Sequence, residues 1–398
     1  MLGNGVQALN EILIVIAGLQ SFDPRCTKMA SSIALDLSTA SGVESYLANT
    51  QFAATRVVPL AGGVGNFTFR LFLSTPHNGH RTVILKHAKP YVALSPDFPF
   101  SVDRQIYESR ALEEVKKSGV CSDLVDVPAV IHHDKTANFL IIEDCGEQAL
   151  TLKQLMLTAT PTLETATRIG AALGEFLGRF HAWGQEQKDL LAFFDQNEQA
   201  KNITAIITYG RLIPMLTTRK VPAVELLSEP IPQEDLDAIQ AIVDERTAQI
   251  HTAKTALTMG DFWTGNVLIN MEPSSGEFLQ ANVIDWELAK PGIRALDVGQ
   301  FCAEMHCVSI FHPEKANSAD ALIKAFLAEY RLHCGEMEDH LAGTAAKHIG
   351  AHLVTIAPTV GWGPPDESVK AVQEGLTYLW EGCSSKWLRE RSMFAPLT

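Results

Sequence analysis

Four polar residues with side chains that bind metal ions or move protons follow one another within a short stretch of the chain. They are Asp261, Asn266, Asp285 and Glu287. Short apolar runs of the β type follow the first pair and precede the second pair, and residues 272–276 indicate a hairpin turn between them. The sequence therefore predicts that a hairpin brings these four side chains to one end.

Three carboxylates and an amide gathered in this way would repel one another without a positive charge between them. Magnesium is the expected partner, because carboxylate and amide oxygens are its hard ligands. The spacing from Asp261 to Asn266 also matches a kinase catalytic loop, in which Asp accepts the substrate hydroxyl proton and Asn holds a metal. Either motif alone is better explained as an ordinary turn or strand end, but together they indicate phosphoryl transfer.

Composition limits the classes of protein to consider. The chain has 398 residues, of which 46% are hydrophobic and 20% charged, as in globular proteins with room for two domains or one bilobal domain. The net charge of −14 disfavours nucleic acid and anionic membrane surfaces as partners. Seven cysteines without a Cys-x-x-Cys pair indicate reduced thiols and a cytoplasmic protein. The oligomeric state is not indicated.

The first 40 residues are predicted to be a poorly defined segment, weakly connected to the rest of the chain. They lack the positively charged leader of a signal peptide, since no basic residue precedes Arg25. Ordered structure is predicted to start at Ser41, where Ser41 and Glu44 have the spacing of a capping box, in a short helix that ends near Asn49.

A glycine-rich turn lies between two predicted strands, residues 55–60 and 67–73. Its candidate phosphate-binding residues are Gly62, Gly63, Gly65 and Asn66. Glycine lets the backbone approach a ligand closely, and its amides can then face phosphate oxygens. An ordinary turn explains the same pattern about equally well.

The next predicted strand, residues 82–88, carries Lys86 at the end of its β-branched run. A lysine there can simply be solvated at an edge, but it is also where kinases place the lysine that binds nucleotide phosphates. A helix is predicted over residues 102–117, and Glu108 is the natural partner for this lysine. Glu113 and Glu114 are alternatives further along the helix, and a solvated helix face would explain all three acids.

Residues 138–146 form a predicted strand that runs into a glycine, as a kinase hinge requires. Main-chain groups from Glu143 to Cys145 would then face adenine. The boundary between lobes is placed near Gly146, which gives an N-lobe for nucleotide binding over residues 41–146 and a C-lobe over residues 147–398 with the catalytic loop and acceptor site.

The C-terminal part is predicted to be mainly helical. Residues 164–183 have strong helical periodicity, and His181 is interpreted as a packed helix residue. Asp297 is a candidate N-cap of a helix that runs through Cys307. The cysteines and histidine at positions 302–307 are assigned to helix packing, because no second cluster completes a metal site. Further helices are predicted over residues 234–254, 318–334, 341–356 and 366–390.

The order of these motifs resembles the aminoglycoside phosphotransferase and choline kinase-like superfamily, over about residues 45–390. Within it, the sequence is most similar to the methylthioribose kinase group, which includes the hydroxytryptamine kinase of psilocybin biosynthesis. The stretches that carry the resemblance are Ile84-Leu85-Lys86-His87-Ala88-Lys89-Pro90, Asp103-Arg104-Gln105-Ile106-Tyr107-Glu108, Met259-Gly260-Asp261-Phe262-Trp263-Thr264-Gly265-Asn266 and Ile284-Asp285-Trp286-Glu287-Leu288.

The resemblance implies an α+β, bilobal, protein-kinase-like fold, with a small β-rich N-lobe, a larger helical C-lobe and ATP in the cleft. It implies Asp261 as the catalytic base or as an acidic residue that orients the substrate, Asn266 and Asp285 as Mg²⁺ ligands, and Glu287 as a ligand for a second metal ion. Lys86, held by Glu108, would bind the phosphates.

The sequence departs from the family pattern in two respects. Met259 stands where most members have a histidine two residues before the catalytic aspartate, a scaffold position whose loss should not abolish activity. Lys347 and His348 stand in the region where methylthioribose kinases carry a pair of arginines for the sugar, which weakens that substrate assignment.

The predicted function is therefore an ATP-dependent kinase of a small-molecule alcohol. A protein kinase is disfavoured because Asp-Phe-Gly and Ala-Pro-Glu are missing. The alternative from another class is a pseudokinase that binds nucleotide or a partner protein. The acidic chain, with Asp261, Glu304, Trp263 and Trp362 available for the acceptor pocket, predicts a neutral or cationic acceptor, amine-bearing compounds included.

Overall fold

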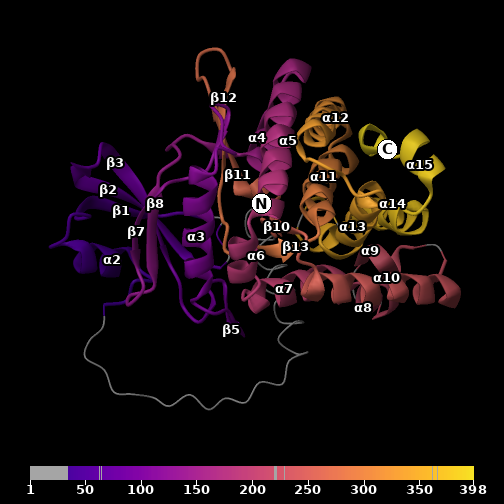
Figure 1. Ribbon diagram of the computed structural model, residues 1–398, viewed down its shortest axis with the longest axis horizontal. Helices are drawn as coiled ribbons and strands as arrows, with labels where there is room; N and C mark the ends of the chain where they lie inside the picture. The colour runs from indigo at the N-terminus through magenta and orange to yellow at the C-terminus, as the bar shows by residue number, and fades with distance from the viewer. Residues whose placement is uncertain are drawn as a thin grey trace. The chain divides into compact units, whose positions relative to one another are not determined.

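The structure, a computed structural model, describes residues 35–61, 63, 65–218, 222–227, 229–360, 362–364 and 366–398. Most of the predicted N-terminal segment, up to residue 34, and also Gly62 lie outside the described residues. The chain forms two compact units (Figure 1). Unit 1 comprises the residues up to Glu113 together with Pro128–Glu147, and unit 2 comprises Glu114–Val127 and Gln148–Thr398.

Unit 1 is built on a five-stranded antiparallel sheet with the strand order β1-β2-β3-β8-β7. The predicted strands are present, and β7 widens the sheet beyond them. The elements are α2 (Ala40–Leu47), β1 (Ala54–Pro59), β2 (Phe67–His77), β3 (His80–His87), β4 (Tyr91–Val92), β5 (Ser95–Pro99), α3 (Arg104–Lys117, in this unit as far as Glu113), β7 (Val130–Asp134) and β8 (Phe139–Glu143).

Strand β3 has different neighbours on its two faces. Val83 and Leu85 are fully buried and belong to a hydrophobic cluster that also contains Val43 and Leu47 of α2, so α2 covers their face of the sheet. Successive side chains of a strand point to opposite faces. Lys86 therefore points away from this cluster, towards α3 on the other face, where it meets a carboxylate.

The start of α2 differs from the predicted capping box of Ser41 and Glu44. The helix begins at Ala40, and Thr39 is its N-cap, with a hydroxyl that accepts a hydrogen bond from the Gly42 amide over 3.1 Å. Thr39 is favoured because its hydroxyl also donates to the Asp36 carbonyl, which fixes the entering chain. The predicted cap was wrong, and both of its residues lie inside the helix.

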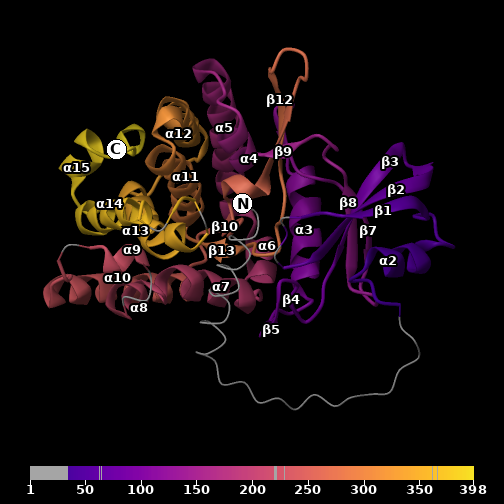
Figure 2. The same ribbon diagram turned by 180° about the vertical axis from the view of Figure 1, so that it is seen from behind.

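Unit 2 is mainly helical and contains a four-stranded sheet of order β6-β12-β11-β9 and a two-stranded sheet of β10 and β13 (Figure 2). Its elements are β6 (Val125–Asp126), β9 (Leu150–Thr151), α4 (Leu152–Thr158), α5 (Leu163–Glu186), α6 (Lys188–Phe194), α7 (Glu198–Thr204), η1 (Ala205–Tyr209), α8 (Leu212–Thr218), α9 (Pro222–Glu225), α10 (Gln233–Thr252), β10 (Ala256–Thr258), η2 (Thr264–Asn266), β11 (Val267–Met271), β12 (Phe278–Val283), β13 (Lys290–Gly292), α11 (Arg294–Phe311), η3 (Pro313–Lys315), α12 (Ala316–His333), α13 (Leu341–Thr355), η4 (Ala357–Thr359), α14 (Ser368–Glu381), α15 (Ser385–Glu390) and η5 (Ala395–Leu397).

The predicted hairpin is confirmed as the antiparallel pair of β11 and β12. Its turn closes through a hydrogen bond of 2.8 Å from the Gly276 amide to the Glu272 carbonyl. Gly276 has a φ of 68°, a conformation that glycine adopts at low cost. The hairpin places the catalytic-loop stretch before β11 and the Asp285 stretch after β12.

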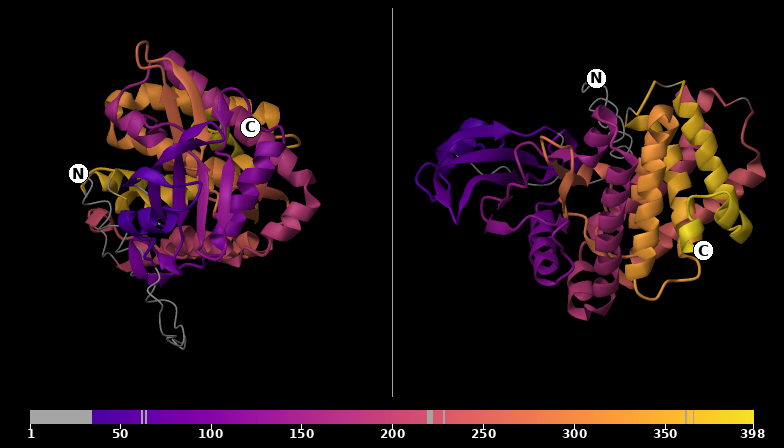
Figure 3. Two further views of the ribbon diagram at one scale, coloured as in Figure 1. Left: turned by 90° about the vertical axis from the view of Figure 1, so that its left-hand side faces the viewer. Right: turned by 90° about the horizontal axis from the view of Figure 1, so that it is seen from above.

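The helices of unit 2 pack side by side in the order α5, α12, α11, α13 and α14 (Figure 3). The contact between α5 and α12 is close because glycines face the α12 backbone. A Cβ atom at Gly170 would overlap the Leu322 carbonyl, and a Cβ atom at Gly174 would overlap the Phe326 carbonyl. These glycines thus let the two helix backbones touch.

Gly174→Ala is expected to destabilise the protein, although alanine has the higher helix propensity by about 1 kcal/mol. The added methyl group must push α12 away from α5, and overpacking of this kind costs roughly 1–3 kcal/mol. Urea unfolding followed by circular dichroism measures the change. A variant that is as stable as the wild type or more stable would contradict the backbone contact.

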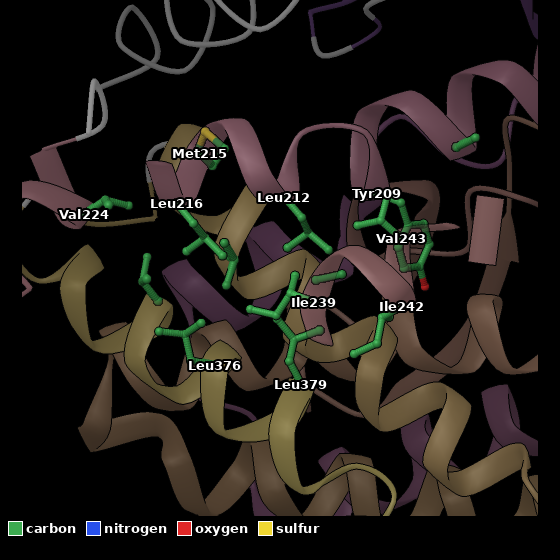
Figure 4. Close-up of a cluster of buried hydrophobic side chains, with 14 of the residues drawn as sticks. Tyr209, Leu212, Met215, Leu216, Val224, Ile239, Ile242, Val243, Leu376 and Leu379 are labelled. Carbon is green, nitrogen blue, oxygen red and sulfur yellow. The ribbon is translucent and has the colours of Figure 1, made fainter. Parts of the chain in front are cut away.

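A second hydrophobic cluster lies where α8, α10 and α14 converge (Figure 4). Leu212 and Leu216 of α8 meet Ile239 of α10 and Leu376 of α14, and all four are buried. The predicted helix over 366–390 is two helices in the structure, because α14 ends at Glu381 and Ser384 is the N-cap of a separate helix, α15. No helix among the described residues has the length and apolarity needed to cross a membrane.

Candidate active site

The predicted site residues are distributed over the two units. Within unit 1, the Lys86 ammonium lies 2.5 Å from a carboxylate oxygen of Glu108, so the predicted pair is present. The Glu108 side chain is fully buried and that of Lys86 is 9% exposed. Gln105, one helical turn before Glu108, donates from its side chain to the Lys86 carbonyl over 2.8 Å. Helix α3 therefore fixes both the backbone and the ammonium of this lysine.

The glycine-rich turn is held by a residue that its sequence context did not single out. Arg104 donates to the Asn66 side-chain oxygen over 3.1 Å and to the Gly65 carbonyl over 2.9 Å. The same guanidinium, 1% exposed, also bonds the carbonyls of Lys89, Phe100 and Ser101. Gly63 belongs to the same turn. Arginine suits this position because its planar fork can serve several oxygens at once.

The predicted hinge residues begin with Glu143, the last residue of β8. The Glu143 amide donates to the Ala129 carbonyl, and the Ala129 amide donates to the Glu143 carboxylate over 3.1 Å. Asp144 forms a bidentate pair with Arg70, at 2.7 and 2.9 Å. Cys145 is half-buried, with its thiol near the Glu143 carbonyl. The segment is thus anchored by side chains, and its adenine contact stays a prediction.

Within unit 2, both carboxylate oxygens of Asp261 accept a hydrogen bond from a side-chain amide. Gln300 of α11 donates to one oxygen over 2.8 Å, and Asn266 donates to the other over 2.9 Å. Burial raises the pKa of Asp261 to about 7, and the Asp285 carboxylate adds to this rise, while the two amide hydrogen bonds oppose it. The carboxylate orientation is fixed by donors from two elements.

Asp285 has an unusual backbone conformation, with a φ of 68°. Such a conformation is uncommon outside glycine and tends to occur at functional sites. Both of its neighbours are fixed: the Ile284 amide donates to the Asn266 carbonyl over 2.9 Å, and the buried Trp286 indole donates to the Val283 carbonyl over 3.0 Å. The neighbours therefore hold Asp285 in this conformation.

Glu287 completes the predicted set of four. It is 7% exposed, and its carbonyl accepts a hydrogen bond of 3.1 Å from the Asn197 side chain, which also bonds the Ala289 carbonyl. The hairpin β11–β12 therefore brings Asn266 and Asp285 together, as the backbone hydrogen bond between Ile284 and Asn266 shows, and Asn197 anchors the segment that carries Glu287.

The donor set fits a hard divalent cation on two observations. Both side-chain hydrogen bonds of Asn266 use its nitrogen, which leaves its side-chain oxygen as the atom suited to a metal. In addition, the negative charge of Asp285 raises the pKa of Asp261, so a cation at Asp285 would relieve a repulsion that the protein otherwise carries.

Asp297 binds the backbone of the catalytic loop. The prediction of this residue as a helix N-cap was wrong. Helix α11 begins at Arg294 after Ile293, so Asp297 lies within its first turn. Its carboxylate accepts hydrogen bonds from the Met259 and Gly260 amides, over 2.8 and 3.0 Å. His181 contacts the same carboxylate over 3.1 Å.

The interpretation of His181 as a packed helix residue is confirmed, because it is fully buried between Asp297 and the Tyr330 hydroxyl. Burial lowers its pKa, which the Asp297 carboxylate opposes. Met259 is fully buried as well and contributes its backbone amide to Asp297. The side chain at position 259 is therefore part of the core, and the loop is held without a histidine there.

A buried lysine lies against the catalytic loop. The sequence analysis did not identify it as part of the site. Lys290 is 3% exposed, and its ammonium group lies against Gly260. Gly260 has a φ of 79°, and a Cβ atom there would overlap the Leu288 carbonyl as well, which explains the glycine. Burial lowers the pKa of Lys290 to about 8, while Asp297 and Asp261 oppose the change. Its position in β13 opposite Thr258 could have been found only from the pairing of β10 with β13.

Arg294 and His348, two basic residues of unit 2, are engaged inside the protein. Arg294 is 1% exposed and bonds the Glu338 carboxylate and the Cys334 and Glu336 carbonyls. His348 accepts or donates a hydrogen bond of 2.8 Å with the Tyr209 hydroxyl, and burial holds its pKa well below the usual range. Neither side chain is available to bind a negatively charged acceptor.

Comparisons with known proteins extend these observations. Residues 56–335 match the phosphotransferase enzyme family. The 4-hydroxytryptamine kinase of Psilocybe cyanescens is 32% identical over 354 residues, which cover 86% of this chain and 92% of the relative. Methylthioribose kinase of Bacillus cereus is 26% identical over 285 residues, covering 66% and 67% of the two chains. A choline/ethanolamine kinase family protein from Mesorhizobium loti is similar in structure, with a TM-score of 0.42, 16% identity and coverage of 89% and 96%.

Proposed function

The chain belongs to the phosphotransferase enzyme family, as its motifs predicted, and on this premise we propose that it is an ATP-dependent kinase of a small-molecule hydroxyl. The observation that carries the proposal is the Asp261 carboxylate, which the side-chain amides of Asn266 and Gln300 fix by one hydrogen bond each. A pseudokinase would not need such an arrangement, since nucleotide binding alone requires no oriented carboxylate for the acceptor.

Three residues of unit 2 would hold the metal. Asn266 and Asp285 are proposed as ligands of Mg²⁺, with Glu287 as a ligand of a second ion. When bound, the cation would neutralise charge on the nucleotide phosphates. The side chains of the protein would bind and orient the two substrates and accept the proton, because phosphoryl transfer depends mostly on positioning and on charge compensation.

Unit 1 is proposed to bind the nucleotide. Lys86, held by Glu108, would bind phosphate oxygens with its ammonium group. The amides of the glycine-rich turn that includes Gly63 and Gly65 would contribute further donors, since Arg104 fixes the backbone there. Main-chain groups between Glu143 and Cys145 would face adenine, with the segment anchored by its side-chain hydrogen bonds.

Unit 2 is proposed to bind the acceptor. Asp261 would accept the proton of the acceptor hydroxyl while a bond forms between that oxygen and the γ-phosphorus. The bond from the γ-phosphorus to the bridging oxygen breaks at the same time, and ADP leaves with the electron pair. Because Gln300 and Asn266 fix the carboxylate before the acceptor arrives, little reorganisation is needed.

The acceptor is proposed to be neutral or cationic, with amine-bearing alcohols included. Arg294 is engaged inside the protein and Lys153 is paired by charge with Glu304, so neither offers an uncompensated cation to a negatively charged acceptor near Asp261. The relatives named 4-hydroxytryptamine kinase support the same class, because that name describes a compound with both a hydroxyl and an amine.

The test is a transfer assay with labelled ATP and Mg²⁺ on amino alcohols, free sugars, sugar phosphates and peptides. Asp285→Asn serves as the inactive control, because asparagine tolerates a positive φ while it removes the ligand charge. We expect labelled product from the amino alcohols, at least about 100-fold less with the control, and none with chelator. Nucleotide binding without turnover on any panel member would favour the pseudokinase, and preference for sugar phosphates or peptides would overturn the acceptor class.

A further inference from the structure

The Lys153 side chain of α4 ends on the face of a tryptophan ring within unit 2. Its ammonium nitrogen lies 3.7 Å from the ring centroid of Trp362 and 5.6 Å from that of Trp263. Trp362 is 5% exposed and stacks on Phe311 at an interplanar angle of 13°. A cation at this distance over an indole face is attracted by the ring quadrupole, so the two rings form a cation-binding surface.

A buried carboxylate completes this surface. Glu304 of α11 is 2% exposed, and its two oxygens interact with the His352 ring at 2.9 Å and the Thr264 hydroxyl at 3.3 Å. Burial raises the pKa of Glu304, but the charge of Lys153 and the bond to His352 outweigh it and hold that pKa below the usual range. The ammonium of Lys153 lies 3.8 Å from the nearer Glu304 oxygen, too far for a hydrogen bond.

The lysine is therefore paired by charge but not locked by direct hydrogen bonding to the carboxylate. Its side chain is 21% exposed, so its flexible stem has access to solvent.

The cation-binding surface adjoins the catalytic loop. Trp263 and Thr264 follow Asp261 closely in the chain, and Thr264 begins η2. On α11, Gln300 contacts Asp261, and Glu304 lies four residues later on the same helix face. The Thr264 hydroxyl also contacts Glu304 directly, so the cation-binding surface is joined to the catalytic loop through both the chain and α11.

We propose that Trp263, Trp362 and Glu304 form a subsite for the ammonium group of the acceptor, and that Lys153 is a resident cation that the acceptor displaces. This rests on the proposed function and adds to it the group that fixes the acceptor. The exchange replaces one ammonium by another, so Glu304 keeps a positive partner in both states. An empty subsite would instead leave a buried charge uncompensated, which is strongly unfavourable.

The two tryptophan rings also favour an aromatic acceptor. Tyramine carries a hydroxyl and an ammonium on opposite sides of an aromatic ring, whereas ethanolamine has no ring between its two groups. The aromatic spacer would also pack on the tryptophan faces.

The test measures binding without nucleotide, so that its outcome does not depend on kinase activity. Isothermal titration calorimetry compares tyramine, its neutral analogue para-ethylphenol and ethanolamine on the full chain. The variants are Lys153→Gln, Glu304→Gln and Trp362→Leu. The matched control is Lys254→Gln, which removes the same charge from a lysine that is 62% exposed and pairs with Asp195.

Wild-type protein is expected to bind tyramine more tightly than either other probe. Lys153→Gln should tighten tyramine binding by roughly 3- to 30-fold, because the acceptor no longer competes with a cation–π interaction of this strength. Trp362→Leu should weaken it by at least about threefold for the same reason. Glu304→Gln should also weaken it, and Lys254→Gln should leave it unchanged.

Weaker or unchanged tyramine binding in Lys153→Gln would show that this lysine is a fixed structural partner of Glu304 and would overturn the proposal. Equal binding of tyramine and para-ethylphenol by the wild type would overturn the ammonium subsite itself. If Glu304→Gln does not fold, the Lys153→Gln result still decides. Either of these two contradicting binding results would overturn the subsite. Turnover of another class of alcohol would in that case still support the proposed kinase activity.

Discussion

Asp261→Asn is expected to lower kcat by roughly 100- to 10,000-fold, the range for loss of a positioned general base. The substitution preserves shape and removes the oxygen that would accept the acceptor's proton. The KM for ATP should change little, because no phosphate contact is removed. Steady-state transfer of labelled phosphate, with ATP and acceptor varied in turn, separates the two effects.

The fold should survive this change with a small loss of stability. Asparagine presents an NH2 group in place of one of the two carboxylate oxygens that Gln300 and Asn266 face, so one hydrogen bond worth about 1 kcal/mol is lost. Asp123→Asn, at an exposed loop position, is the control for the change of charge. A variant of Asp261 that keeps more than about a tenth of the wild-type kcat would be incompatible with a general base at this position.

The core of the candidate site could be predicted because its residues lie close together in the chain. Asp261 and Asn266 share one loop, and a single hairpin turn at residues 272–276 brings Asp285 back beside them. Apolar alternation and a glycine turn are local signals, so they fix the strands and the order of the motifs. The pair of Lys86 and Glu108 was predictable for a related reason, since one strand and the next helix supply it.

The residues that support this site could not be predicted in the same way. Gln300 and Asp297 reach the catalytic loop only because α11 packs against β10, and no local pattern reports that contact. Arg104 binds five oxygens of its own unit, although in the sequence it is one charged residue of a helix. Asp297 was predicted to be a helix cap because it lies near a helix start, but its oxygens accept hydrogen bonds from a loop that is distant in the sequence.

Lys153, near the proposed acceptor subsite, is another residue whose position could not be predicted from the sequence. The sequence offered Glu304, Trp263 and Trp362 as candidates, but the lysine that lies against them comes from α4, more than a hundred positions earlier in the chain. A prediction of acceptor charge from net composition treats Glu304 as an open carboxylate. The structure shows instead that a cation already accompanies it, so the charge balance of the pocket depends on whether that cation can leave.

Lys86→Met is expected to reduce ATP turnover by at least about 100-fold and to destabilise unit 1. The ammonium that binds phosphate oxygens is lost while the aliphatic stem remains. The same change leaves the fully buried Glu108 carboxylate without its ammonium, and breaking a buried ion pair by removal of one partner costs roughly 3–5 kcal/mol. Turnover measured on this variant alone would therefore mix lost binding with lost folding.

The double variant Lys86→Met/Glu108→Gln separates the two contributions. A neutral amide at position 108 removes the buried charge, so most of the lost stability should return, as thermal unfolding would show. Turnover should stay low, because neither substitution restores a cation for the phosphates, and binding of a fluorescent ATP analogue should be weakened in both variants. Recovery of turnover together with stability would show that Lys86 supports the fold alone and that another cation binds the nucleotide phosphates.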